Sequence, residues 1–447
     1  MSNRIVSILW GDLRGGELKK FVLLALGFFC LIGSWWPLKT LKDGVFINLV
    51  GAHYLPLAKM LSLALFFPMV LLYSKLVDQV SKQKLIYFFI TFYGSIGLVF
   101  VYFLHDPVIG LGNLAVGPHR WLGWAFFVYA ESFISLMLSL YQSFINDILT
   151  PESAKKGYGL IIFGAQFGGF LFTLLGNFLS SDPSLYIQRV PLIAFISIMM
   201  IFMIAIIVFI LEHSVERKHL QGYQEHVEAI DGVQQQKTEN IGFLEGLRLL
   251  FTHAYVAGIF GLIFFQELIS TLMGFQMSLL VESTIKDPGM VNKFLFDFAF
   301  AVQAIACLFG LLGTSFFQRN FGIRFCLTSY PIFLGMFIIA YLYSPTLSTI
   351  FYVMLIAKAL NFAFNQPAKE VLYIPTSRDI KYKSKAWIDM FGLRFAKASG
   401  SFFNQFAGAV VAYSGFFAIG LIAVWTVLGS KLGSVFKKTV DNNRIIG

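Results

Sequence analysis

A small set of charged side chains lies inside long apolar stretches of this sequence, and these are the side chains that could do chemistry. If the stretches span a bilayer, burying a charged side chain costs roughly several kcal/mol unless the side chain faces water or a partner. Each of these side chains is therefore a functional candidate. Lysine offers a point charge for phosphate or carboxylate oxygens, whereas glutamate accepts hydrogen bonds, pairs with lysine or carries a proton. The candidates are the basic Lys39, Lys42, Lys59, Lys358, Arg394 and Lys397, and the acidic Asp43, Glu131, Glu267, Asp297 and Asp389.

The first cluster follows a proline, in the stretch WWPLKTLKDG at residues 35–44. Pro37 removes a backbone donor, so we expect an interruption of the helix that lines a cavity. The alternative is that Lys39, Lys42 and Asp43 mark only an external helix end. For Lys59 and Lys358 the favoured interpretation is different, because a lysine can extend its ammonium to the membrane interface along a lipid-facing stem.

Glu131 and Glu267 lie deep in their apolar stretches, where we favour a cavity-facing role over a structural ion pair. Lys397 precedes Ala398, Ser399 and Gly400, small residues that let two helices approach closely. Arg394 lies three residues earlier on a similar helix face. We expect one of these two cations to reach a cavity and the other to return to the cytoplasmic rim.

The composition indicates the class of structure that positions these charged residues. The 447 residues are 57% hydrophobic, 17% aromatic and only 13% charged, which excludes a soluble globular chain and predicts an all-α polytopic membrane protein. A span takes about 20 helical residues. We predict twelve transmembrane helices at residues 20–50, 54–74, 85–104, 121–147, 158–180, 190–211, 250–281, 294–317, 325–343, 346–368, 386–411 and 414–431.

The loop charges predict the orientation and the domains. Lys and Arg are concentrated in alternate loops, including Lys369 to Lys385, and the opposite loops hold only Arg120, Arg189, Lys286 and Lys293. This bias places both termini in the cytoplasm. A polar linker at 212–249 separates six-helix bundles at 1–211 and 250–447. Two such bundles predict a major-facilitator-type fold with alternating access to one site.

Several kinds of chemistry have no motif here. There is no GxxxxGK[ST] loop, no HExxH, no nucleophile elbow and no Cys/His cluster, so we expect neither an enzyme nor a bound cofactor or metal. The basic loops carry no nucleic-acid-binding motif, so we expect a lipid bilayer and no nucleic acid as partner. Cys30, Cys307 and Cys326 are interpreted as buried apolar residues. The charged start runs directly into a full-length span, so no cleavable signal is expected.

Three segments resemble the nucleotide transporter family of ATP/ADP translocases, known from intracellular bacteria and plastids. The first is KEVLYIPTSRDIKYKSKAWIDMFGLRFAKASG at residues 369–400, similar to the family's KEMAYIP, KGKAAID and KSGG elements. The second is INDILTPESAKKGYGLIIFGAQFGG at residues 145–169, and the third is LKTLKDG at residues 38–44. Together with the order of the spans, they extend the resemblance over the whole chain.

The resemblance implies exchange of ATP for ADP and phosphate, in a bacterial inner membrane or a plastid inner envelope. It also implies that Lys42, Glu131, Glu267 and Lys397 bind the substrate. Additional candidates are Lys39, Asp43, Asn146 and Arg394. We expect the chain to act as a monomer.

Two departures from the family pattern keep other substrates open. Lys39 and Thr40 stand where the family has Arg-Asp, and no basic residue follows Glu267 at the family position. The alternatives are a proton-coupled importer of other nucleotides, NAD or another organic anion, and a membrane scaffold that transports nothing.

Overall fold

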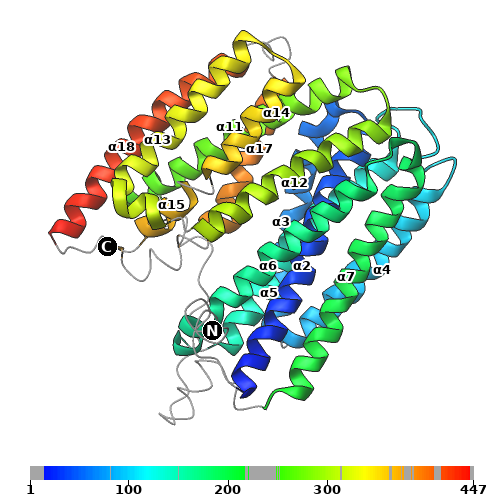
Figure 1. The fold of residues 1–447 in the computed structure, drawn as a ribbon, viewed down its shortest axis with the longest axis horizontal. Coiled ribbons are helices and arrows are strands. Elements are labelled where there is room, and N and C mark those ends of the chain that lie inside the picture. The colour runs from blue at the N-terminus through cyan, green and yellow to red at the C-terminus, as the bar shows by residue number, and fades with distance from the viewer. Residues whose placement is uncertain are drawn as a thin grey trace. The chain divides into compact units, whose positions relative to one another are not determined.

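The computed structural model describes residues 15–80, 82–149, 151–216, 220, 248, 250, 252–312, 315–361, 365–373, 375–376, 384, 387–406 and 414–442. These residues are helical almost throughout (Figure 1). The first six long helices are α2 (Gly15–Leu49), α3 (Leu55–Gln79), α4 (Lys82–His105), α5 (Trp121–Ile148), α6 (Pro151–Leu179) and α7 (Tyr186–Ser214). The next six are α11 (Ala254–Thr284), α12 (Pro288–Leu312), α13 (Ser315–Tyr343), α14 (Leu347–Leu360), α17 (Leu393–Phe406) and α18 (Ser414–Asp441).

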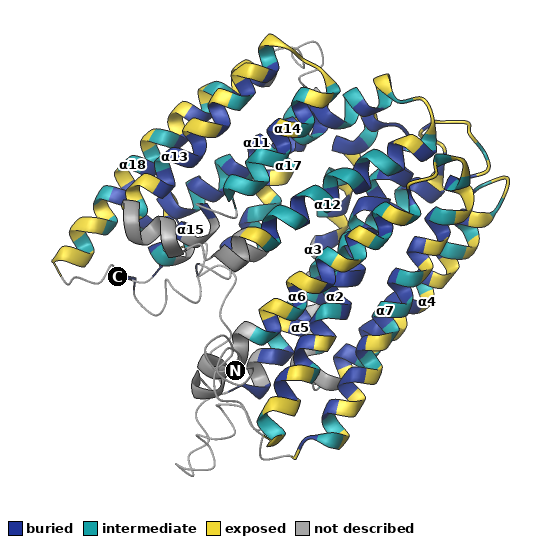
Figure 2. Ribbon diagram, viewed as in Figure 1, coloured by how far each residue is buried: buried dark blue, intermediate teal, exposed yellow. Residues whose placement is uncertain are grey.

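These helices confirm the predicted all-α membrane fold with twelve spans. In the described part of the chain, nine helices are long and apolar enough to cross a membrane. Ala52–Phe66, within α3, and Leu347–Leu360, which is α14, are shorter apolar helices. The remaining one of the twelve helices is α17, which carries Arg394 and Lys397. Figure 2 shows exposed residues along α4, α7 and α18, whereas most residues of α2 are buried. The exposed positions on α4 include Phe88, Phe92 and Val99, which suit contact with lipid.

The predicted interruption at Pro37–Gly44 is wrong, because α2 continues through it. A membrane helix tolerates proline where hydroxyl groups and neighbouring helices satisfy the freed backbone groups. Here Pro37 is buried and lines a small cavity with Phe172 of α6 and Ile193 of α7. Lys39, Lys42 and Asp43 therefore lie on a helix, and the proline does not mark their surroundings as a broken segment.

Two other predicted spans have different limits in the structure. In the tenth, the α-helix α14 covers Leu347–Leu360 and the α-helix α15 covers Gln366–Leu372, with π-helical geometry at Asn361 and Asn365. A π-helical turn, η5 (Ile388–Gly392), precedes α17. The helix α13 starts earlier than predicted and changes direction at Gly322, whose φ of 77° breaks its regular geometry.

The described residues group into two compact units. Unit 1 comprises Met1–Gly51, Ala64–Gln235 and Ile285–Ala304, and unit 2 comprises Ala52–Leu63, Gln236–Thr284 and Ile305–Gly447. In unit 1, α2 packs against α6, α7 and α5. In unit 2, α11 packs against α17 and α18, and α13 packs against α18. The domain limits drawn from the sequence, at 1–211 and 250–447, stay a prediction.

The part of α12 up to Ala304 belongs to unit 1, where it makes polar contacts with α6 and with Ser180, which follows α6. The side-chain amide of Asn292 donates to the hydroxyl of Ser180 at 2.9 Å. Asp297 accepts from Asn177 and pairs with Lys293 at 2.8 Å. Asp297, one of the acids considered as a buried charge, is thus held in a local ion pair.

The loop between α4 and α5 is organised around Arg120, which is 6% exposed. One terminal nitrogen of its guanidinium donates to the carbonyls of Asn113 and Ala115, at 2.9 and 2.7 Å. The other donates to those of Ile109 and Gly110, at 3.0 and 2.7 Å. One planar fork therefore satisfies four backbone acceptors.

We expect Arg120→Lys to lower the free energy of unfolding by about 2–4 kcal/mol, because a lysine cannot reach all four carbonyls and buried acceptors are left without donors. Thermal unfolding of the purified protein in detergent measures this. Arg189→Lys, in the first turn of α7, is the control and should change stability by about 0.5 kcal/mol or less. Equal effects of the two substitutions would contradict the role given to Arg120.

Candidate functional site

Lys42 lies at the centre of a charged cluster in unit 1, formed by one face of α2 and one face of α5. Its Nζ is 2.8 Å from Oδ1 of Asp43 and 3.3 Å from Oε2 of Glu131. The same ammonium lies over the ring of Phe127, 4.2 Å from the centroid. Phe127 and Glu131 are four residues apart on α5, so they share one face of that helix. The predicted site residues Lys42 and Glu131 are therefore in contact.

The exposed part of this cluster is carboxylate. The side chain of Lys42 is 6% exposed, whereas those of Asp43 and Glu131 are 36% and 33% exposed. One cation with two carboxylates has a net charge of about −1, and the cation is covered by its partners. The cluster as it stands can accept hydrogen bonds from amino or hydroxyl groups, and an anion reaches Lys42 only by displacing a carboxylate.

The additional candidates in unit 1 have different positions. Asp43 is part of the cluster. Lys39 lies one turn before Lys42, with its Nζ 4.5 Å from the ring centroids of both Trp35 and Trp36. A lysine over two indole faces is held by cation–π attraction. The side chain of Asn146 lies outside the described residues.

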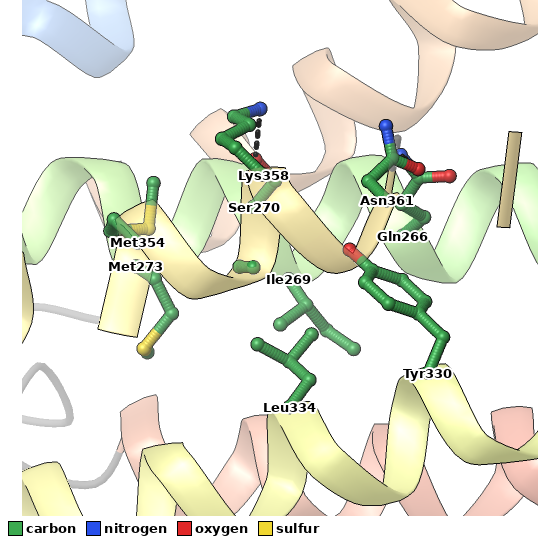
Figure 3. A pocket seen from close by; sticks show the side chains of 10 residues that line it. Gln266, Ile269, Ser270, Met273, Tyr330, Leu334, Met354, Lys358 and Asn361 are labelled. Atoms are coloured by element: carbon green, nitrogen blue, oxygen red, sulfur yellow. Dashed lines mark hydrogen bonds between the residues drawn. The ribbon is translucent and has the colours of Figure 1, made fainter. Parts of the chain in front are cut away.

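Unit 2 contains a pocket bounded by α11, α13 and α14 (Figure 3). Lys358 of α14 lines it and donates from Nζ to the hydroxyl of Ser270 at 3.3 Å. Glu267 lies within electrostatic range of Lys358 and of the Tyr330 hydroxyl, and Lys397 lies within electrostatic range of Lys358. The two predicted site residues of unit 2, Glu267 and Lys397, thus meet around a lysine that was assigned to the membrane interface.

The helix α17 carries Lys397 and Arg394. Lys397 is exposed and Arg394 is half-buried. A β-carbon on Gly400 would lie 3.0 Å from the Cβ of Thr271, so α17 approaches α11 as closely as the small residues predicted. Which of the two cations reaches a cavity stays a prediction.

A network of amides adjoins the pocket. The Oε1 of Gln266 accepts from Lys369 and from Asn365, both at 2.6 Å, and its Nε2 donates to Oδ1 of Asn361 at 2.9 Å. Asn365 also donates to Oδ1 of Asn361 at 3.0 Å. Lys369 was predicted in a solvated cytoplasmic loop, and this was wrong for that residue: it lies on α15 and its ammonium contacts α11.

Sequence reasoning missed Lys358 as a pocket residue, together with Gln266, Tyr330 and Asn361. A signal was present for the amides, because Asn361, Asn365 and Lys369 follow one another at intervals of four. That spacing places polar groups on one helical face. Within the described residues, no group of three or more His, Cys, Asp and Glu side chains is arranged to hold a metal ion.

Comparison with known proteins relates this geometry to a family. The chain is 25% identical to ADP,ATP carrier protein 2, chloroplastic, of Arabidopsis thaliana, over 96% of this chain and 76% of the relative. It is 24% identical to ADP,ATP carrier protein 1 of Chlamydia pneumoniae, over 97% of this chain and 94% of the relative. It is 21% identical to ADP,ATP carrier protein 4 of Rickettsia bellii, over 98% and 94% respectively.

Solved structures support the fold. A bacterial homologue of the iron transporter ferroportin, in an inward-facing state, matches with a TM-score of 0.63 at 12% identity, over 93% of this chain and 99% of the other. A proton:xylose symporter of the major facilitator superfamily matches with a TM-score of 0.53 at 13% identity, over 93% and 94%. The family model described as TLC ATP/ADP transporter matches residues 2–436. The chain therefore belongs to the TLC ATP/ADP transporter family.

Proposed function

We propose that this protein exchanges ATP for ADP across a membrane by alternating access, and that Lys42, Glu131, Glu267 and Lys397 bind the substrate. The observation that carries the proposal is the buried Lys42, held between Asp43 and Glu131 inside an apolar helix. The names of the curated relatives, ADP,ATP carrier proteins, support the choice of nucleotide. The likeness to solved transporters supports the mechanism through the fold alone.

In this proposal the lysines bind phosphate oxygens and the glutamates exchange partners. When the site is empty, Glu131 and Asp43 neutralise Lys42. When a nucleotide enters, its phosphate takes the place of a carboxylate on the ammonium, and the carboxylate is released to accept hydrogen bonds from amino or hydroxyl groups of the substrate. The loaded and empty states then differ in which charges are paired. A carrier that reorients only when occupied needs such a difference in interaction free energy between its conformations.

The remaining parts of the proposal concern setting and organisation. The bundles are 1–211 and 250–447, joined by a cytoplasmic linker at 212–249, and both termini are cytoplasmic. The membrane is a bacterial inner membrane or a plastid inner envelope, and the chain works as a monomer. Lys39 and Arg394 stay additional candidates for substrate contact.

Uptake into proteoliposomes tests the exchange. Vesicles loaded with ADP should accumulate labelled ATP, and vesicles without internal nucleotide should accumulate little, because reorientation of the empty carrier is slow. A protonophore should leave the exchange unchanged. Uptake that needs no internal nucleotide and stops with the protonophore would replace this proposal with the proton-coupled importer.

A further inference from the structure

Lys358 has no assigned role, and its surroundings do not look like those of a lysine at a membrane interface. It comes from the last turns of α14 and lines the unit 2 pocket together with α11 and α13 (Figure 3). Its hydrogen bond is to the hydroxyl of Ser270, at 3.3 Å. A hydroxyl supplies no charge to balance an ammonium, and an ammonium carries three donors. The residue thus has capacity for an acceptor of opposite charge.

The charges around the pocket favour an anion. Lys397 lies within electrostatic range of Lys358, and so does one carboxylate, Glu267. Lys369 reaches the same region through Gln266. Among the described groups, two lysines, Lys358 and Lys397, therefore lie with one glutamate, and Lys369 contacts the adjoining Gln266. In unit 1, by contrast, two carboxylates surround Lys42. Excess positive charge in a region of low dielectric is stabilised by a bound anion.

The shape and the polar groups of the pocket define which part of a substrate fits. It contains about 330 Å³ of space not filled by protein atoms, its open mouth included. Much of this space is open to solvent, and the enclosed part has room for little more than one water molecule. A whole nucleotide therefore does not fit, and a phosphate group enters from the mouth only as the lining side chains move apart. Tyr330, on one wall, is buried and its ring packs edge-on against Trp425 at 5.2 Å. That wall is held in place before a ligand arrives.

The amide network orients a further donor. Both Gln266 and Asn365 donate to Oδ1 of Asn361, which fixes the oxygen end of that amide. The NH₂ end of Asn361 is then directed away from the network, and Asn361 lines the pocket. An ammonium, a hydroxyl and an amide NH₂ are the donor types that bind a phosphate group.

We propose that Lys358 and Ser270 form a phosphate-binding subsite in the unit 2 pocket, so that Lys358 is a fifth charged substrate-binding residue. This rests on the proposed nucleotide exchange. Lys358 binds a phosphate oxygen through its ammonium. The hydroxyl of Ser270, which accepts a hydrogen bond from Lys358 in the empty subsite, rotates to donate a hydrogen bond to the same phosphate. Glu267 offsets the charge of the ammonium while the subsite is empty.

Binding of ATP, ADP, AMP and adenosine to the purified full-length protein tests the subsite. Lys358→Met should weaken ATP and ADP binding about tenfold or more, the loss expected when a charged hydrogen bond is removed, and should leave adenosine binding unchanged. Ser270→Ala should weaken ATP binding by about three- to tenfold. Lys59→Met, which removes a half-buried lysine that does not line the pocket, should bind all four ligands as the unaltered protein does.

The outcomes separate this inference from the proposed function. If the unaltered protein exchanges ATP for ADP but Lys358→Met binds ATP with unchanged affinity, the subsite is disproved and the exchange stands. An equal loss for adenosine and ATP also overturns it, because a distorted pocket would affect every ligand alike. If Lys358→Met does not fold, unchanged ATP affinity in Ser270→Ala decides against the subsite. If the unaltered protein neither binds nor exchanges nucleotides, the proposed function is disproved, and the subsite, which rests on it, is disproved as well.

Discussion

Lys42→Met is expected to abolish ATP/ADP exchange, with a fall of at least about 100-fold in the initial rate. Lys42 is the cation shared by Asp43 and Glu131, and both carboxylates lose it together. Breaking a buried pair by removing one partner costs about 3–5 kcal/mol, because it leaves an uncompensated charge. Labelled ATP uptake into ADP-loaded proteoliposomes measures the rate, and Lys59→Met is the control for loss of a lysine from an apolar helix.

A fall in rate could also follow from unfolding, so a second variant separates the two effects. In the triple variant Lys42→Met, Asp43→Asn and Glu131→Gln, the three charges of the cluster are removed together, and the side chains keep about the same size. We expect this protein to unfold at a temperature close to that of the unaltered chain and still to exchange nothing. Exchange by the triple variant at a normal rate would mean that the cluster serves only the fold.

The architecture could be predicted from the sequence because membrane spans need length and apolarity, which a sequence displays directly. The run from Pro191 to Leu211 needs no knowledge of its neighbours to be assigned to a helix, and α7 contains it. Charge inside such runs is equally visible, so Lys42 and Glu131 could be selected from their position alone. Their contact could not, since it depends on how α2 lies against α5, and the two residues are far apart in the chain.

The wrong assignments have the same physical cause: the sequence does not show which groups surround a side chain. Pro37 removes a donor in any helix, but its neighbours decide whether that helix breaks, and α2 does not. Lys358 has a stem long enough to reach the interface, but α11 places Ser270 beside it instead. Lys369 reads as part of a basic loop, because a sequence does not show that the side chain of Gln266 lies within reach.

A large loss of stability is also expected when two glycines of α6 are substituted, because these glycines allow α2 to pack closely against α6. A β-carbon on Gly164 would lie 2.5 Å from the carbonyl oxygen of Ala25, and one on Gly168 would lie closer still to that of Phe29. Glycines four apart present one smooth helix face, which is how membrane helices approach closely. The atoms they meet are backbone, which cannot turn aside as a flexible side chain can.

We therefore expect Gly164→Ala with Gly168→Ala to lower stability by about 2–6 kcal/mol, since overpacking costs about 1–3 kcal/mol at each position. Thermal unfolding in detergent measures the loss. The control is Gly420→Ala on α18, where nothing lies within 4 Å of an added β-carbon. There, alanine should be neutral or stabilise the helix by up to about 1 kcal/mol. Equal unfolding temperatures for the double variant and the control would contradict the close approach of α2 and α6.

The same double variant should reduce exchange in the protein that remains folded, because α2 carries Lys42 and cannot move away from α6 without moving relative to α5. The ammonium is 3.3 Å from Oε2 of Glu131, so a displacement of about 1 Å removes the hydrogen-bonded geometry. Exchange per folded molecule should therefore fall for the double variant and stay unchanged for Gly420→Ala. A normal rate per folded molecule would show that transport does not depend on the contact between Lys42 and Glu131, and that α6 contributes to stability alone.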